Sequence, residues 1–355
     1  MRQLGLAWPG VSFALASAAL FGGSTPLAKL LLGNGANPWL LAGLLYLGSG
    51  VGLGAIQVVR ALIGAPSAEA PLTRADLPWL GLIILAGGVV GPVLLMLGLA
   101  STPASSASLL LNLEGLATMA IAWVIFRENV DRRLLFGAFA ILGGALLLSW
   151  EGGPSGIGLG ALAIACACIA WGIDNNLTRK LSSADPVQIA LIKGLVAGCA
   201  NFTLALALGA RLPPLPTLIG AAIVGFFGYG VSLVFFVLGL RHLGTARTGA
   251  YFSTAPFIGA LLAVLILGEL LTVRLLIAGV LMAVGLYFHL TEAHAHEHSH
   301  TDMNHEHRHR HDAHHQHAHG PNDPPGGIDF QATPSRRTGP TWYGVCPLWV
   351  ESGHR

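Results

Sequence analysis

Residues 123–135 read WVIFRENVDRRLL, and residues 264–276, which lie 141 positions further along the chain, read VLILGELLTVRLL. The two stretches share an acidic residue, Glu128 in the first and Glu269 in the second, and both end in Arg-Leu-Leu. The match extends in both directions without a gap. A long part of the chain is therefore present twice, and this duplication decides the fold.

The composition predicts a protein of the lipid bilayer. Of the 355 residues, 53% are hydrophobic and only 10% are charged, against about 25% in an ordinary soluble domain. The mean hydropathy is +0.65, and 47 glycines would allow close contact between membrane helices. This balance excludes a soluble enzyme or binding module as the main body. The net charge of +2, without a recognition motif, also argues against nucleic acid as a partner.

Ten apolar runs are long enough to cross a hydrocarbon core of about 30 Å. They cover approximately residues 8–29, 37–59, 77–99, 104–126, 134–150, 157–178, 187–208, 216–239, 246–267 and 274–290. The duplication divides them into two groups of five, and an odd number of spans turns the second copy upside down. We therefore predict an all-α integral membrane fold of ten transmembrane helices in two inverted five-helix repeats, an architecture typical of secondary transporters.

Lysine and arginine predict the orientation, because cytoplasmic loops carry the excess of positive charge. With the N-terminus inside, ten such residues lie on the cytoplasmic side, and three, Lys29, Arg211 and Arg274, lie outside. We expect Lys29 to snorkel from the end of its span. Both termini are then cytoplasmic, in a multi-pass protein of the inner (plasma) membrane.

Several motifs resemble the EamA family of the drug/metabolite transporter superfamily, and in particular a bacterial subgroup with a His-rich tail. They are the repeated 123–128 and 266–269 segments, together with NLEG at 112–115, WGIDNNLTRK at 171–180 and RHLGTARTGA at 241–250. The resemblance covers about residues 8–290. It implies ten helices, a central cavity lined by the first four helices of each half, and export or exchange of small organic solutes.

The expected domain organisation follows. We expect a first repeat at residues 1–150, a second repeat at 151–290, a His-rich cytoplasmic tail at 291–320 and a disordered Pro- and Gly-rich extension at 321–355. The extension departs from the family pattern, and no function is assigned to it.

Glu114 is the leading candidate for a transport residue. Ionisable side chains at membrane depth are costly, so those that persist are functional candidates. Glu114 lies near the middle of the fourth span, without a basic residue one helical turn away. A desolvated carboxyl there is suited to bind a proton in one state and to release it in another. The alternative is a protonated structural acid that is hydrogen-bonded between helices.

A second group of polar residues lies near the cytoplasmic side. Asp174, followed by Asn175, and Lys193 lie at similar depth on consecutive spans, so an Asp174–Lys193 pair is plausible. This pair is either structural or opened by the substrate. Arg247 at the start of the ninth span either faces a cavity or, as we favour, is an interfacial cation. Pro26, Pro92 and Pro256 interrupt apolar runs and are hinge candidates.

The tail contains twelve of the fifteen histidines. They are His294, His296, His298, His300, His305, His307, His309, His311, His314, His315, His317 and His319. We expect the tail to bind Zn, Ni, Co or Cu ions, although the same histidines would also gain charge near pH 6 and attach to anionic lipid. No cofactor is required by the transport function.

The sequence thus predicts a non-enzymatic secondary transporter that moves a small metabolite or drug-like solute, in the direction of export. The expected partners are the small-molecule substrate, protons, the lipid bilayer and a second copy of the chain. Two alternatives stay open. One is a divalent transition-metal transporter, and the other is a membrane-anchored metal sensor or store whose helices only carry the tail.

Overall fold

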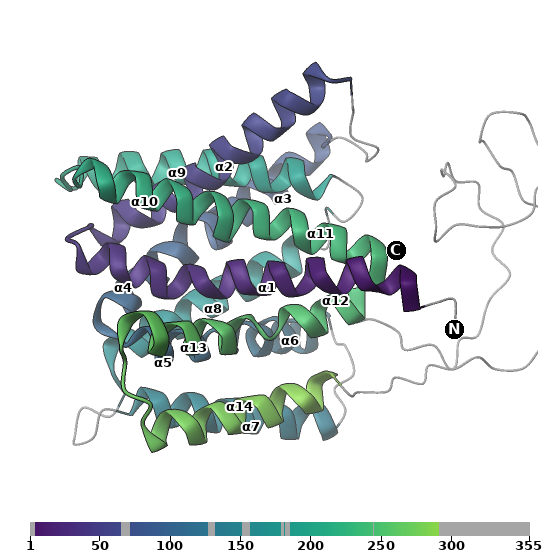
Figure 1. The fold of residues 1–355 in the computed structure, drawn as a ribbon, viewed down its shortest axis with the longest axis vertical. Helices are drawn as coiled ribbons and strands as arrows, with labels where there is room; N and C mark the ends of the chain where they lie inside the picture. Colours follow the sequence, from purple (N-terminus) through teal and green to yellow (C-terminus); the bar gives the residue numbers. More distant parts are fainter. Residues whose placement is uncertain are drawn as a thin grey trace, which may run out of the picture. The chain divides into compact units, whose positions relative to one another are not determined.

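The computed structural model describes residues 4–64, 72–126, 132–150, 157–178, 181, 185–243 and 245–290. Within these residues the chain is almost entirely helical and has no strand, apart from one isolated bridge between Trp150 and Ile157. Figure 1 shows the helices as a bundle of long rods that run roughly in one direction. The histidine tail and the extension that follows it lie outside the described residues.

The helices follow the predicted apolar runs. They are α1 (Leu4–Gly33), α2 (Pro38–Leu62), α3 (Leu77–Ile83), α4 (Gly91–Ser101), α5 (Ala104–Leu110), α6 (Leu113–Phe126), α7 (Arg132–Ser149), α8 (Leu159–Thr178), α9 (Pro186–Ala207), α10 (Leu215–Gly225), α11 (Ser232–Leu243), α12 (Thr245–Phe252), α13 (Ala255–Leu267) and α14 (Val273–Leu290). Two π-helical segments, η2 (Ile84–Val90) and η4 (Phe226–Val231), join α3 to α4 and α10 to α11.

Local sequence signals fix two of the helix starts. Asn37 caps α2, because its side chain accepts hydrogen bonds from the backbone amides of Trp39 (3.0 Å) and Leu40 (3.2 Å). Asp185 caps α9 in the same way through the amide of Val187 (2.8 Å). In both cases a proline follows at the first helical position, where its missing N–H is no loss.

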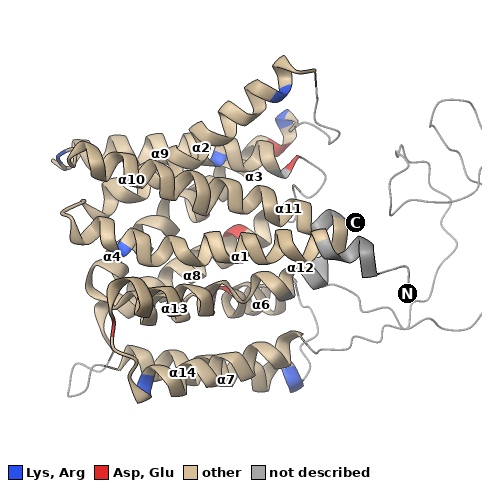
Figure 2. Ribbon diagram, in the orientation of Figure 1, with Lys and Arg blue, Asp and Glu red and all other residues tan. Residues whose placement is uncertain are grey.

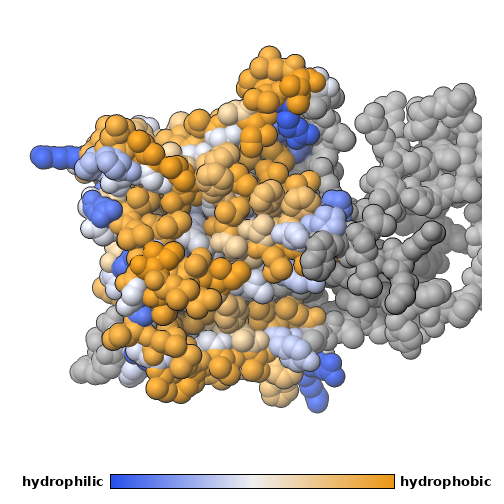
Figure 3. Space-filling model, in the orientation of Figure 1, coloured by the Kyte–Doolittle hydropathy of each residue, from blue (hydrophilic) through white to orange (hydrophobic). Residues whose placement is uncertain are grey.

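Nine helices among the described residues are long and apolar enough to cross a membrane. The predicted run 246–267 is instead divided between α12 and α13, and only Ala255–Leu267 remains as a shorter apolar helix. The face seen in Figure 3 is apolar over most of its area, and hydrophilic residues gather toward the helix ends. Charged residues are few in Figure 2 and lie mainly at those ends. Such an exterior fits a multi-pass membrane protein.

Three sets of contacts build the bundle. Helix α2 packs along α9, α7 packs along α14, and α1 lies between α11 and α13 (Figure 1). Helix α8 lies in the same way against α4 and α6. Small residues bring the backbones close together, since a Cβ added at Gly194 of α9 would lie 2.9 Å from the Cα of Gly50 in α2.

Candidate functional site

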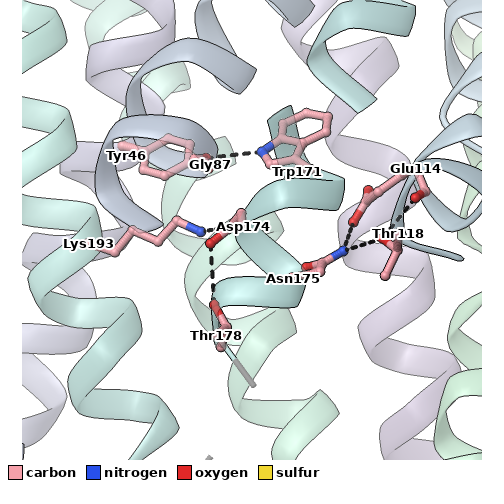
Figure 4. A network of polar contacts seen from close by, with 9 residues as sticks. All are labelled: Tyr46, Gly87, Glu114, Thr118, Trp171, Asp174, Asn175, Thr178 and Lys193. Atoms are coloured by element: carbon pink, nitrogen blue, oxygen red, sulfur yellow. Dashed lines mark hydrogen bonds and ion pairs between the residues drawn. The ribbon is translucent and has the colours of Figure 1, made fainter. Parts of the chain in front are cut away.

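The π-helical segment η2 forms one wall of the candidate site. Its Gly87 carbonyl accepts two hydrogen bonds, from the Tyr46 hydroxyl of α2 (2.8 Å) and the Trp171 indole N–H of α8 (3.0 Å), as Figure 4 shows in part. The neighbouring Gly88 carbonyl accepts one from Asn201 Nδ2 of α9 (3.1 Å). Donors from three helices therefore hold a stretch of backbone whose helical hydrogen bonding is irregular. Such π-helical turns occur frequently at functional sites.

An ion pair lies directly against this wall. Lys193 Nζ of α9 donates to Asp174 Oδ2 of α8, and the Thr178 hydroxyl donates to Asp174 Oδ1 (3.3 Å). Asp174 is buried, and a Cβ added at Gly87 would lie 2.0 Å from its Oδ2. The pair that the sequence predicted is thus present. It packs against a position where only glycine leaves room.

An apolar cluster lies between the ion pair and the adjacent ends of α8 and α9. Leu80 and Ile83 of α3, Leu181 and Ile189 form its buried core, and Leu177 packs against them. Ile189 precedes Lys193 by one helical turn, and Leu177 follows Asp174 by about one turn. The cluster therefore separates the charged pair from these ends of the helices and lowers the local dielectric around it.

Glu114 lies on the other side of α8, at a break in the fourth span. Helix α5 ends at Leu110, the chain turns through Leu111 and Asn112, and α6 begins at Leu113. The span predicted at 104–126 is present as Ala104–Ile125, but it contains this turn, in which Asn112 Nδ2 donates to the Leu109 carbonyl (2.8 Å). The break places the Glu114 carboxylate in the first turn of α6, where a negative charge is favoured by the helix dipole.

Asn175 connects this carboxylate to α8. Its Nδ2 donates to Glu114 Oε1 (3.0 Å) and to the Thr118 hydroxyl (3.2 Å), which in turn donates to the Glu114 carbonyl (2.9 Å). Figure 4 shows that Asp174 and Asn175, consecutive on α8, point to opposite sides. One turn of α8 therefore touches both the ion pair and Glu114. Among the described residues no cation lies within ion-pair distance of Glu114.

This arrangement can hold charge in two ways. Glu114 bonds only neutral donors among the described residues, so it can take up a proton or a cationic group. The Asp174–Lys193 pair can open to a charged group that replaces one partner. Both events would change contacts that α8 makes, through Asn175 in the first case and Asp174 in the second. They would also reach η2, because Asp174 touches Gly87.

The other predicted site residues are distributed differently. Arg247 belongs to α12, but its side chain lies outside the described residues, as do the twelve tail histidines. Pro26 was expected to interrupt its span, yet α1 continues through it. Pro92 lies in the first turn of α4 after η2, and Pro256 in the first turn of α13 after the break at Ser253–Thr254. Among the described residues no group of three His, Cys, Asp or Glu side chains could hold a metal ion.

The chain matches the EamA-like transporter family over residues 8–150 and again over residues 158–291. It belongs to this family.

Individual relatives of this EamA-like transporter agree. It is 30% identical to an uncharacterized transporter of Methanothermobacter thermautotrophicus, over 81% of this chain and 86% of the relative. It is 28% identical to a probable amino-acid metabolite efflux pump of Salmonella typhimurium, over 53% and 67% of the two chains. It is 25% identical to the uncharacterized inner membrane transporter YedA of Escherichia coli, over 66% and 76%. A crystal structure of a protein with 19% identity superposes with a TM-score of 0.58 over 78% of this chain and 95% of that one, which shows the fold alone.

Sequence reasoning missed several residues of the site in this EamA-like transporter. Tyr46, Trp171 and Asn201 all bond the η2 backbone, but nothing in their local sequence indicates a common partner. The adjacent glycines Gly87 and Gly88 inside an apolar run were the available signal. Lys29 was expected to snorkel, and the sequence did not predict that its ammonium bonds the carbonyls at the end of α4.

Proposed function

We propose that the protein is a secondary transporter that exports a small metabolite or drug-like solute across the inner membrane by alternating access. One observation carries this proposal. The network of Glu114, Asn175, Asp174 and Lys193 joins α6 of the first half to α8 and α9 of the second. A solute or proton bound there touches both halves of the protein. Binding can therefore bias their relative arrangement.

The ten-helix inverted-repeat arrangement is part of the proposal, with the boundary between repeats at residues 150 and 151. The family match occurs twice, once in each proposed repeat. The segments η2 and η4 lie about 141 residues apart, which is the offset of the sequence repeat. The breaks at 111–112 and 253–254 also correspond within one residue. In this arrangement α12 and α13 together form the ninth span.

The proposed orientation has both termini in the cytoplasm. It follows from the distribution of lysine and arginine and places the apolar cluster around Leu181 at the cytoplasmic end. Lys29, Arg211 and Arg274 then lie at the outer end. The inner membrane as location is supported by the YedA relative, which is named as an inner membrane transporter.

We assign proton coupling to Glu114. Its carboxylate lacks a cationic partner among the described residues and is bonded by an amide that can adapt to either protonation state. The Asp174–Lys193 pair is the proposed contact for a charged group of the solute. The substrate class is left broad, although the efflux-pump relative makes amino-acid-like solutes the first compounds to test.

The test uses the full chain. Thermal unfolding of the purified protein is measured against a panel of amino acids, nucleosides, amines, drugs and divalent metals, since a ligand of the folded state raises the melting temperature. The stabilising compound is then followed in proteoliposomes with an imposed pH gradient. Glu114→Gln should abolish the dependence on the gradient, whereas Asp76→Asn, a matched change at a half-exposed position, should leave it intact. Equal pH dependence of wild type and Glu114→Gln would overturn the proton role.

For the tail we propose Zn, Ni, Co or Cu binding that is separate from transport. Metal as cargo is the second candidate, because the described residues contain no group of three His, Cys, Asp or Glu side chains that could hold a metal ion. Stabilisation of a chain ending at Glu292 by a transition metal would reverse this assignment. If removal of the tail alone had the same effect on the cell as deletion of the whole protein, this would favour the metal sensor or store.

A further inference from the structure

The two-residue link between α4 and α5 is held from both sides by charged residues. Lys29 of α1 donates through Nζ to the carbonyls of Leu99 (2.6 Å), Ala100 (3.2 Å) and Thr102 (2.9 Å) at the end of α4. Glu269 accepts from the amides of Ala104 (2.6 Å) and Ser105 (2.8 Å) at the start of α5. A cation thus meets the free carbonyls of one helix and an anion meets the free amides of the next, the favourable sign in both places.

The two residues come from opposite ends of the sequence. Lys29 lies in the first helix, and Glu269 follows α13 directly. Gly268 ends α13 in the left-handed conformation (φ 65°), which turns the chain so that Glu269 reaches α5. The link therefore fastens α1, α4, α5 and the end of α13 to one another. Neither residue has a role in the network around Glu114.

The seam below this link is built from small residues. Ser108 of α5 faces α13, since a Cβ added at Gly259 would lie 2.8 Å from its hydroxyl oxygen. Helix α1 meets the same face of α13, since the Cβ added at Gly259 would also lie 2.6 Å from the Gly22 carbonyl. Small residues let the backbones approach without interlocking side chains. At Gly259 and Ser108 the contact between α5 and α13 is therefore made by small residues.

The seam also contains an unsatisfied polar group. Ser108 is 1% exposed, and its hydroxyl has no hydrogen-bond partner among the described residues. A buried hydroxyl without a partner is costly, and water that enters an open seam would satisfy it. Helix α5 leads from the link to the break just before Glu114. Separation of α5 from α13 would thus give water and solute a route toward Glu114.

Building on the proposed function, we infer that Lys29 and Glu269 are positioning residues that together lock the α4–α5 link, and that this lock must release before Glu114 becomes accessible from this end of the bundle. Each holds one side of the same two-residue link, so loss of either residue frees it. The lock acts on the conformational step and not on the binding of the solute.

The experiment measures opening of the seam by thiol labelling. Ser108→Cys is introduced into the full chain with its four native cysteines replaced by Ala, and the protein in nanodiscs reacts with a polar maleimide. Glu269→Gln and Lys29→Met should each raise the labelling rate about tenfold, the factor expected for loss of a charge-assisted hydrogen-bond pair. The double variant should label no more than about threefold faster than the faster single variant, since both changes free one link.

Controls separate a lock from general loosening. Arg274 at the same end bonds the Leu147 carbonyl of α7 and the Trp150 carbonyl that follows α7, so Arg274→Gln should change the labelling rate less than twofold. The conservative changes Glu269→Asp and Lys29→Arg should restore slow labelling. Cys168, which is fully buried in α8, provides a second control. A chain in which it is the sole cysteine is treated with the maleimide, and Cys168 should stay unreactive in every variant.

The outcomes are decisive without a known solute. Unchanged labelling in both Glu269→Gln and Lys29→Met would overturn the lock, as would an equal rise with Arg274→Gln or at Cys168. Either variant alone decides the question if the other does not fold. Labelling does not involve Glu114, so a failed proton role leaves this result standing, and a failed lock leaves the pH test of Glu114 standing.

Discussion

Gly87→Ala should disrupt the site more than a methyl group added anywhere else in η2. The added Cβ would lie 2.0 Å from Asp174 Oδ2, 2.3 Å from its Cγ and 2.7 Å from its Cβ, against ordinary contacts of 3.4–4 Å. All three atoms belong to a side chain held by Lys193 and Thr178, so the clash cannot be relieved by a free rotamer. The carboxylate must move by more than 1 Å, which separates it from Lys193.

The magnitude follows from two contributions. Overpacking of a well-packed site costs about 1–3 kcal/mol. A buried charge that loses its partner costs up to about 3–5 kcal/mol. If relaxation recovers part of this, we expect a net loss of about 3 kcal/mol in the free energy of unfolding. For a domain of a few hundred residues this lowers the melting temperature by roughly 6–12 °C.

Gly81→Ala provides the matched control. Gly81 lies in α3 of the same span, and an added Cβ there meets no atom within 4 Å. It should stabilise slightly, because alanine favours the helix by up to about 1 kcal/mol. Thermal unfolding of the full chain in detergent, followed by tryptophan fluorescence, measures both variants. Equal melting temperatures for Gly87→Ala and Gly81→Ala would refute the contact between Gly87 and Asp174.

Three further predictions concern the donors on η2, the ion pair and the tail. Tyr46→Phe and Trp171→Phe should each cost about 0.5–1.5 kcal/mol of unfolding free energy. The double variant should cost more than their sum, because only then does the Gly87 carbonyl lose both donors. Additive values in thermal unfolding would count against shared bonding. Asp174→Ser alone should cost about 3–5 kcal/mol, whereas Asp174→Ser combined with Lys193→Leu should recover most of it, which the same measurement checks. The full chain should bind several Zn²⁺ ions by titration at pH 7.5 and far fewer at pH 5.5, where imidazole is protonated, and a chain ending at Glu292 should bind none; metal binding that survives the truncation would contradict this.

The positions of the helices could be predicted because hydrophobic length is a local property of the sequence. The run 37–59, for example, became α2 (Pro38–Leu62), and Asn37 and Pro38 mark its start. The breaks inside spans could not be predicted from proline alone. Pro26 leaves α1 intact, whereas the break before Glu114 contains no proline and depends on Asn112 bonding its own turn. An asparagine in an apolar run does not predict such a turn by itself, because Asn201 lies inside the continuous helix α9.

The candidate site divides in the same way. The Asp174–Lys193 contact could be predicted, because two charges at equal depth on consecutive helices have few other partners. The link between Asn175 and Glu114 joins residues 61 positions apart across the two halves, and no spacing rule predicts it. The bonds of Lys29 and Glu269 also depend on which helix ends meet. Long-range contacts of this kind require the structure.

The duplication also bears on the proposal that the ion pair serves transport. At an offset of 141 residues, Gly228 of η4 corresponds to Gly87. When Gly22 is aligned with Gly172, Ser24 corresponds to Asp174. The contact between Gly228 and Ser24 repeats the contact between Gly87 and Asp174. A Cβ added at Gly228 would lie 2.7 Å from the Ser24 Cβ, and one added at Gly87 would lie 2.7 Å from the Asp174 Cβ. The equivalent contact between the two halves is therefore made with a neutral serine.

The counterpart of Lys193, aligned through Pro38 and Pro186, is the buried Leu45. The fold thus already contains a version of the site without charge, and the packing at Gly228 does not need an ion pair. Two charges at membrane depth are costly to retain unless they act in the cycle. The Asp174→Ser and Lys193→Leu double variant copies the uncharged half, so it should fold and yet not transport. A double variant that transports at the wild-type rate would show that the ion pair is dispensable to the cycle.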